Sequence, residues 1–441
     1  MSLSPALVHL QNLLRIDTSN PPGRERAALD YLAGVLKQAG IPFQLQETAP
    51  DRGNLVARLK GDGSQRPLLL SSHVDVVPAE AEHWSQPPFS GVIEKGFIYG
   101  RGAIDMKNFT AMTLAVILKA HSERWPLKRD IIFCAVSDEE NGSEWGMKAL
   151  VDQHPDWVDA EFALSEVGAY TTWIGGRPFY PIQTGEKGVI WLEVEFRGQT
   201  GHGSVPRLHN AHWKLGEFLQ RIRGAAFPHH PSASAMRFAE EMATTVPLPL
   251  SLVFRAMKYP WGPRFLKAVL EKGQNKVAPL IAMVTNTVNP TGTQSGHKTN
   301  VVPSSAKLIL DCRIVPGQDL DSLLREIQVI AGQDFSVRVL NEKRGHEVSC
   351  DTELFRILKN SLERAHPGAK AVPWLTVGFT DAYQLQRIGV QCYGFTPVQL
   401  PEDIDFSLLY HGHDERIPVE GFDWGLRVLE DVVKEFVCAG S

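Results

Sequence analysis

Short apolar runs that end in polar residues mark the first half of the chain. They cover residues 68–70, 131–136 and 162–164, and they lead into Ser-Ser-His, Ser-Asp-Glu-Glu and Ser-Glu. Uninterrupted apolar runs of this length predict strands buried on both faces of a sheet, as in parallel sheets. Apolar residues at three- and four-residue spacing predict helices over residues 25–39, 108–121, 351–365 and 420–437. Together these patterns predict an α/β fold in which helices flank a central mixed sheet.

The pattern changes after residue 187. Residues 189–196 alternate between apolar and polar, which predicts a strand with one face in water. Further strands are expected at 282–287, 306–314 and 335–340, and helices at 211–223 and 321–331. The order β-α-β-β-α-β is that of a ferredoxin-like α+β module.

The α/β pattern returns after this module, so the sequence predicts an insertion of one domain into another. Residues 1–187 and 342–441 would form the discontinuous catalytic domain, and residues 188–341 the inserted domain. Residues 224–280 are an extra segment of the insertion. We interpret this segment as additional helical packing; the alternatives are an apolar cover over a substrate or a dimer surface.

Composition narrows the classes of partner. The chain has 441 residues, with 45 lysines and arginines against 50 acidic residues, a net charge of −5. Because no basic block is present, nucleic acid or a membrane is not expected as the main partner. No secretion signal or membrane-spanning run is apparent, so a cytoplasmic protein is predicted. The five cysteines form no C-x-x-C pair, so a metal site would have to use imidazole and carboxylate ligands.

Acidic and imidazole side chains follow the predicted parallel strands. Ligands of open α/β sheets bind beyond the carboxyl ends of the strands. The side chains expected there, or in loops that reach the same edge, are His73, Asp105, Glu140, Glu166 and His411. Two zinc ions could share a bridging carboxylate and still leave room for water.

Two further carboxylates are suited to supporting roles. Asp75 follows His73 by two residues and could fix the tautomer of that imidazole. Glu139, beside Glu140, could carry a proton between water and a leaving amine. Taken singly, each acidic motif is equally well explained as a helix start, a cap or a surface residue. The occurrence of all these motifs together in one chain indicates a functional site.

The ordered set of motifs resembles the co-catalytic zinc aminoacylases and carboxypeptidases, a family that includes carboxypeptidase S, glutamate carboxypeptidase and succinyl-diaminopimelate desuccinylase. The resemblance covers nearly the whole chain. Its motifs are Ser-Ser-His73-Val-Asp75, Gly-Arg-Gly-Ala-Ile-Asp105, Ser-Asp-Glu139-Glu140, Ser-Glu166, Gly-His202-Gly-Ser, Asn300-Val-Val-Pro, Asp-x-Arg313 and Tyr-His411-Gly-His-Asp-Glu415-Arg.

The resemblance implies a role for each residue. His73 and Glu166 would hold one Zn2+, Glu140 and His411 the other, and Asp105 would bridge them, with Co2+ or Mn2+ as possible substitutes. Glu139 would be the general base and Asp75 the orienting residue. His202 would stabilise the oxyanion, and Asn300 and Arg313 would bind a free carboxylate of the substrate. His413 is the alternative to His411. The inserted domain would serve as a lid and as the interface of a homodimer.

The function expected from the resemblance is hydrolysis of the amide bond of N-acyl-L-amino acids or short peptides with a free carboxylate. A dipeptidase or carboxypeptidase is an alternative within the same family, and a non-catalytic protein that binds small molecules is an alternative of another class. A dinucleotide-binding loop is not supported, because Asp105 stands where the third glycine after Gly100 and Gly102 would be needed. A serine hydrolase is not supported either, because Gly203-Ser204 lacks the downstream glycine of a nucleophile elbow.

Overall fold

The computed structural model describes residues 3–404 and 409–438 and divides into two compact units. Unit 1 comprises Met1–Thr184, Val348–Trp374 and Thr380–Ser441, and unit 2 comprises Gly185–Glu347 and Leu375–Phe379. Among the described residues, no helix is both long enough and apolar enough to cross a bilayer.

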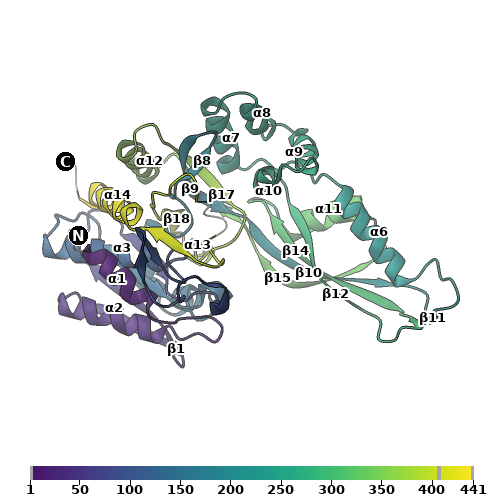
Figure 1. Cartoon of the computed structure of the whole chain (residues 1–441), viewed down its shortest axis with the longest axis horizontal. Helices are drawn as coiled ribbons and strands as arrows, with labels where there is room; N and C mark the ends of the chain where they lie inside the picture. The colour runs from purple at the N-terminus through teal and green to yellow at the C-terminus, as the bar shows by residue number, and fades with distance from the viewer. Residues whose placement is uncertain (1–2, 405–408, 439–441) are drawn as a thin grey trace. The chain divides into compact units, whose positions relative to one another are not determined.

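Unit 1 is built on a mixed sheet flanked by helices, as the sequence predicted (Figure 1). The strand order is β1-β2-β6-β3-β7-β18-β9, and β8 and β17 also pair with β9. The strands are β1 (Phe43–Ala49), β2 (Arg52–Leu59), β3 (Leu68–His73), β6 (Ile131–Val136), β7 (Phe162–Ser165), β8 (Thr172–Ile174), β9 (Arg177–Glu186), β17 (Lys370–Thr376) and β18 (Gln391–Gly394). A small separate sheet contains β4 (Ile93–Glu94), β5 (Phe97–Tyr99) and β19 (Arg416–Pro418).

The helices of unit 1 cover both faces of the mixed sheet, because its central strands are apolar on both faces. In β3, Leu68 and Leu70 pack into one core and Leu69 into another. The first core receives residues of α1 (Pro5–Leu14), α2 (Arg26–Gln38), α3 (Lys107–Ser122), α12 (Glu353–Ala365) and α14 (Val419–Val437). The second receives residues of α4 (Met147–Gln153), α5 (Pro155–Val158) and α13 (Ala382–Gln386).

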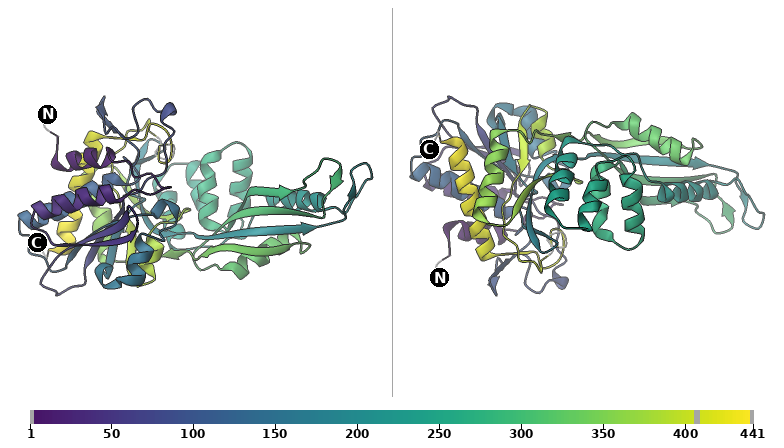
Figure 2. Two further views of the ribbon diagram at one scale, coloured as in Figure 1. Left: turned by 90° about the horizontal axis from the view of Figure 1, so that it is seen from below. Right: turned by 90° about the horizontal axis from the view of Figure 1, so that it is seen from above.

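Unit 2 contains an antiparallel sheet with helices beside it (Figure 2). Its strand order, β12-β14-β10-β15, is the ferredoxin-like arrangement. Its elements are β10 (Gly188–Arg197), α6 (Ala211–Gly224), β12 (Thr287–Ser295), β14 (Ser305–Ile314), α11 (Leu320–Ala331) and β15 (Ser336–Lys343). Apolar residues on one face of β10 and β14 pack against α6 and α11. The opposite face is wetter, and Trp191 of β10 is exposed there. Short strands β11 (Gly201–His202) and β13 (Val301–Val302) pair with each other in this unit, and β16 (His346–Glu347) pairs with the end of β9, beyond which the mixed sheet does not continue among the described residues.

The extra segment of the insertion is helical. It contains α7 (Ala233–Thr245), α8 (Leu250–Ala256), α9 (Gly262–Glu271), the 3-10 turn η3 (Asn275–Val277) and α10 (Ala278–Val284). The strand predicted at residues 282–287 was wrong, because α10 continues to Val284 and β12 begins only at Thr287. Leu280, Met283 and Val284 are buried at helical spacing, and such a short apolar run is ambiguous between helix and strand.

Candidate metal centre

The parallel strands of unit 1 bring the predicted acidic and imidazole side chains to one edge of the sheet. Strand β3 pairs in parallel with both β6 and β7, with His73 opposite Val136 and Leu70 opposite Leu164. The residues that follow these strands therefore emerge together. His73 ends β3, the 3-10 turn η2 (Glu139–Asn141) follows β6, and Glu166 follows β7.

Asp105 lies between the two predicted histidine ligands. Its Oδ1 is 3.1 Å from Nε2 of His73, and its Oδ2 is 3.2 Å from Nε2 of His411. One carboxylate thus faces two imidazoles through different oxygens, which is the arrangement that a carboxylate bridging two metal ions requires.

Each histidine also faces a second carboxylate. Glu140 Oε2 is 3.1 Å from Nε2 of His411, and Glu166 Oε2 is 3.5 Å from Nε2 of His73. Glu139 Oε2 is farther from the same His73 nitrogen, at 4.0 Å. By proximity alone, His73, Glu139 and Glu166 form one set of possible ligands, and His73, Asp105 and Glu140 form another. Glu139 therefore competes with Glu166 for a place beside His73, and the shorter distance favours Glu166.

The electrostatics of this cluster favour bound cations. Burial alone would lower the pKa of His73, but the Glu166 and Asp105 carboxylates raise it well above its usual value. Hydrogen bonds that the protonated His411 ring donates to the Asp105 and Glu140 carboxylates raise the pKa of His411 to about 10. Burial, together with the charge of Glu166, raises the pKa of Glu139 well above its usual value. The carboxylates thus draw protons onto the imidazoles, and metal ions would replace those protons.

An orphaned oxygen supports the same conclusion. Within the described residues, the buried Oε1 of Glu140 has no hydrogen-bond partner. Buried polar atoms are almost always satisfied, and a missing ion is one of the ordinary explanations for an exception. Imidazole nitrogens and carboxylate oxygens are also the donor set that Zn2+ accepts. The residues present therefore fit a metal centre.

Asp75 organises the backbone of the two glutamates. Nδ1 of His73 donates to the backbone oxygen of Asp75 at 3.0 Å and lies 3.4 Å from its carboxylate. The same carboxylate accepts hydrogen bonds from the backbone N–H groups of Glu139 (3.2 Å) and Glu140 (3.1 Å). A side chain predicted only to orient His73 thus also fixes the turn that carries both glutamates.

Asn20 and Arg52 support this turn from behind, a role that the sequence did not indicate. Nδ2 of Asn20 donates to Asp75 Oδ2 at 2.9 Å and to Asp138 Oδ1 at 3.1 Å. Arg52 donates to the side-chain oxygen of Asn20 and to Asp138 Oδ1, the latter at 2.6 Å. Glu25 is also buried in this group, 3.5 Å from Arg52. The Asn20-Pro21-Pro22 sequence is typical of a loop, so it gave no reason to expect that Asn20 supports a turn of the site.

Glu415 holds the loop that leads to Asp105. Its carboxylate accepts backbone hydrogen bonds from Gly102 (3.0 Å), Ile104 (2.6 Å) and Asp105 (3.1 Å), and it pairs with Arg101 at 2.8 Å. Glu415 is fully buried. Glu415 belongs to the same sequence motif as His411. The motif therefore pointed to this residue, but the sequence alone did not indicate its role.

The alternative ligand His413 contacts other residues of unit 1. His413, the alternative ligand, is 3.8 Å from Glu80 through Nε2, and its ring lies 5.1 Å from that of His83. No contact with Asp105 or Glu140 is seen for it in the described part of the chain, whereas His411 contacts both. His202, Asn300 and Arg313 belong to unit 2.

Within unit 2, His202 and Asn300 are exposed neighbours. Their segments pair through β11 and β13, and the Gly203 N–H donates to the Asn300 carbonyl at 2.8 Å. His202 Nδ1 lies 2.7 Å from Ser204 Oγ. Arg313 forms a two-point ion pair with Asp311, at 2.6 and 2.9 Å. A substrate carboxylate that binds Arg313 would therefore have to share its guanidinium with Asp311. The sequence did not indicate this ion pair.

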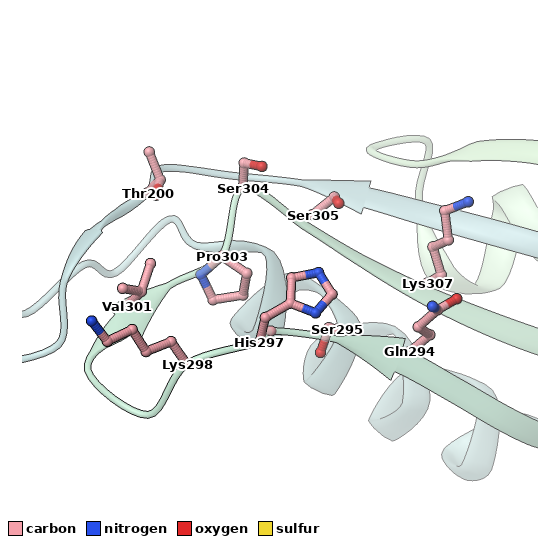
Figure 3. Close-up of a pocket in the computed structure, with 11 residues that line it drawn as sticks. Thr200, Gln294, Ser295, His297, Lys298, Val301, Pro303, Ser304, Ser305 and Lys307 are labelled. Atoms are coloured by element: carbon pink, nitrogen blue, oxygen red, sulfur yellow. The ribbon is translucent and has the colours of Figure 1, made fainter.

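A cavity of about 420 Å3 borders this region of unit 2. Its walls come from the end of β12, the loop that carries His297 and Lys298, β13 and the start of β14 (Figure 3). The lining contains Lys298 and Lys307 and lacks acidic residues. It is therefore a cavity of different chemistry from the metal centre of unit 1.

Comparison with known proteins places this geometry in a family. Residues 69–435 match peptidase family M20/M25/M40. The chain belongs to that family. The N-fatty-acyl-amino acid synthase/hydrolase PM20D1 of Bos taurus is 27% identical over 388 residues, which cover 85% of this chain and 75% of the relative. Aminoacylase-1 of Sus scrofa is 28% identical over 432 residues, covering 94% and 90%.

A solved structure has the same fold. The M20 family metallo-carboxypeptidase Sso-CP2 from Sulfolobus solfataricus superposes with a TM-score of 0.70 at 19% identity, over 98% of this chain and 99% of the other. Membership of the M20 family, together with its relatives, makes the protein an enzyme, a metallo-hydrolase. The family resemblance predicted from the motifs is confirmed.

Proposed function

We propose that this M20 enzyme hydrolyses the amide bond of N-acyl-L-amino acids, or of short peptides, that bear a free carboxylate. The placement of Asp105 between His73 and His411 is the observation that carries the proposal, because it matches a shared ligand of two ions. The two relatives are named as an N-fatty-acyl-amino acid synthase/hydrolase and an aminoacylase, which favours acylated amino acids over longer peptides.

The metal centre would hold two Zn2+ ions. His73 and Glu166 would bind one, Glu140 and His411 the other, and Asp105 both. Binding of two metal ions is typical of this family. When bound, such ions polarise the scissile carbonyl and lower the pKa of water. Co2+ or Mn2+ would be accepted by the same donor set.

Glu139 would move the proton. Its carboxylate takes a proton from the attacking water as the water oxygen adds to the carbonyl carbon. It returns that proton to the amine nitrogen as the C–N bond breaks, so that a carboxylic acid and an amine are released. Burial raises the pKa of Glu139 above that of an ordinary carboxyl group, which makes its carboxylate a stronger proton acceptor.

Asp75 and the residues of unit 2 would position the reactants. Asp75 holds the imidazole of His73 and the backbone of Glu139. His202 would donate a hydrogen bond to the oxyanion, and Asn300 and Arg313 would bind the free carboxylate of the substrate. Support for these three residues comes from their motifs, from the exposure of His202 and Asn300, and from the planar guanidinium of Arg313.

Unit 2 would also form a homodimer. Leu208 and Trp213, which flank the start of α6, are exposed, and large exposed apolar side chains are typical of interfaces. Sedimentation velocity of wild type and Trp213→Glu would test this; a dimer in both would place the interface elsewhere. The cytoplasmic location stays a prediction, to be checked by fractionation of the source cells.

The function is tested by measuring amine release from a panel of N-acyl amino acids, dipeptides and the same compounds with an amidated carboxyl group. Glu139→Gln is compared with Glu144→Gln, a matched change at an exposed glutamate that pairs with Lys148. We expect Glu139→Gln to lose at least about 100-fold in kcat while keeping the metal, and Glu144→Gln to keep full activity. Amidated substrates should be poor.

Other results would change the proposal. Activity on dipeptides alone would favour a dipeptidase, and release of only the C-terminal residue from longer peptides would favour a carboxypeptidase. Unchanged activity in Glu139→Gln would refute its role as the base. Equal turnover of amidated and free substrates would refute recognition of the carboxylate.

A further inference from the structure

Helices α8 and α9 of unit 2 carry a cluster of exposed apolar side chains. We define the α8–α9 face as Leu248 (70% exposed), Leu252 (49%), Tyr259 (50%), Trp261 (54%) and Phe265 (39%), together with the exposed cations Arg255, Arg264 and Lys272. The aromatic members are contiguous. The Tyr259 and Trp261 rings stack at 5.6 Å, and Trp261 meets Phe265 edge to face at 6.0 Å. Isolated exposed apolar residues are ordinary, but a contiguous patch indicates an interaction surface.

The helical repeat explains why this face is exposed as a whole. On α9 and at its two caps, the exposed residues Trp261, Arg264, Phe265 and Lys272 fall at helical spacing, whereas Leu266 is buried. On and beside α8, Leu248, Leu252 and Arg255 are exposed, whereas Phe254 is buried. The buried side chains anchor the helices to unit 2. The buried side chains account for only one face of these helices, so the interpretation of the segment as additional helical packing does not explain the exposed face.

The charge of this segment is opposite in sign to that of the whole chain. Between residues 247 and 280 there are six lysines and arginines and one glutamate, a net charge of +5, although the chain as a whole has −5. Lys258 pairs with Glu240 at 3.4 Å, and Lys267 donates to two backbone carbonyls. The other cations, Arg255, Arg264, Lys272 and Lys276, are exposed.

From this combination, we infer that the α8–α9 face docks on the surface of an anionic lipid bilayer. Tyrosine and tryptophan prefer the boundary between headgroups and acyl chains, leucine and phenylalanine enter the outer acyl region, and lysine and arginine pair with anionic headgroups. The inference concerns a peripheral contact and does not depend on the proposed hydrolysis. The overall composition argued against a membrane as the main partner. A net negative charge of the whole chain does not exclude a local patch of positive charge, however.

A second copy of the chain is a poorer occupant of this face. A two-fold contact would bring the same face of both subunits together. The exposed cations Arg255, Arg264 and Lys272 of the two copies would then repel each other. The anionic lipid surface instead complements both the cations and the apolar side chains.

The test is co-sedimentation of the full-length protein with vesicles of phosphatidylcholine alone and of phosphatidylcholine with 30% phosphatidylserine. Two variants probe the face. Trp261→Gln/Phe265→Gln removes apolar contact, and Arg255→Gln/Arg264→Gln/Lys272→Gln removes charge. The matched control, Lys37→Gln/Lys95→Gln/Arg356→Gln, removes the same charge from exposed positions in unit 1.

We expect wild type and control to bind the anionic vesicles and not the neutral ones. The charge variant should bind roughly 100-fold more weakly, since each of the three cations near such a surface contributes about a factor of 5. Binding of the wild type should fall at high salt. Far-ultraviolet circular dichroism and turnover of a short-chain soluble substrate should be unchanged, which excludes misfolding.

Several outcomes would overturn the inference. These are equal vesicle binding by wild type and both face variants, equal binding to neutral and anionic vesicles, and an absence of vesicle binding by the wild type. If the face variants instead convert an oligomer to a monomer in sedimentation velocity, the face is a contact between copies of the chain and the lipid inference is wrong.

Discussion

The hydrogen bonds of Asn20 make a sharp prediction about the turn that carries Glu139 and Glu140. Asn20 Nδ2 donates to Asp75 and Asp138 at once, and its oxygen accepts from Arg52. Hydrogen bonds to buried charged groups contribute about 1.5–3 kcal/mol each. Because the three bonds belong to one network and their contributions are not additive, Asn20→Ala should lower the free energy of unfolding by less than their sum, about 2–5 kcal/mol, as measured by urea denaturation.

The effect on catalysis should be mainly on kcat. Asp75 accepts the backbone N–H groups of Glu139 and Glu140, so loss of its support from Asn20 releases the turn. A displacement of about 1 Å at a reacting group can cost about 100-fold. We expect kcat of Asn20→Ala to fall about 10- to 100-fold, with a smaller change in KM. Asn12→Ala is the matched control, because Asn12 is half-buried and its amide donates to Tyr31, away from the site.

Asn20→Asp separates electrostatics from shape. The variant keeps the size of the side chain but sets a carboxyl group about 3 Å from two carboxylates. At an effective dielectric constant of 20, each such pair repels by roughly 5 kcal/mol, so the introduced group should bind a proton. Asn20→Asp should therefore be less stable than Asn20→Ala at pH 8, and the difference should shrink as the pH falls. If Asn20→Asp is as stable and as active as wild type at pH 8, the Asn20 side chain supports the turn through its shape alone, and the electrostatic reasoning is wrong.

Further predictions concern buried charge and metal retention. The Glu25 carboxyl has a pKa raised by burial to about 7 from 4.5, so the folded state binds the extra proton and wild-type stability should fall as the pH rises from 4.5 to 7. Glu25→Gln should remove that slope in urea titrations and gain up to about 3 kcal/mol at pH 8; an unchanged slope would contradict this. Glu415→Gln should destabilise the protein by about 3–5 kcal/mol in the same assay, because it breaks a buried ion pair. His411→Gln should retain fewer metal ions by elemental analysis after gel filtration, whereas His413→Gln should retain the wild-type number; the reverse would exchange their roles.

Much of the fold could be predicted because its strands are apolar on both faces. Leu69 and Ile132 are buried in one core while Leu68 and Ile131 are buried in the other. Such strands must lie inside a sheet covered by helices, and parallel pairing then brings their carboxyl ends to one edge. Strands that lack this pattern were missed. The sequence did not indicate β1, whose residues are mostly exposed or half-buried, or β9, which contains Pro178 and Pro181.

The residues of the metal centre could be predicted from residue type and position, because imidazoles and carboxylates are the usual metal ligands and several of them directly follow predicted strands. Their supports are not distinctive. Asn20 and Arg52 are 55 and 86 positions from the aspartates they hold, Asp75 and Asp138. Sequence spacing does not encode which distant donor satisfies a buried carboxylate, because that choice is made by packing. Arg313 shows the same limit, since its pairing with Asp311 depends on where two neighbouring side chains of β14 point.

The buried polar network also explains why the turn after β6 can hold two glutamates close to other carboxylates. Left alone, carboxylates gathered at one edge would repel and the turn would open. The Asp75 and Asp138 carboxylates are instead tied to Asn20 and Arg52, and the Asp75 carboxylate in turn accepts the N–H groups of Glu139 and Glu140. The backbone is thus fixed by neutral and cationic donors behind it, while the glutamate side chains stay available. A site that must bind cations needs this separation, because direct neutralisation of Glu140 or Glu166 by arginine would remove the charge that attracts the metal.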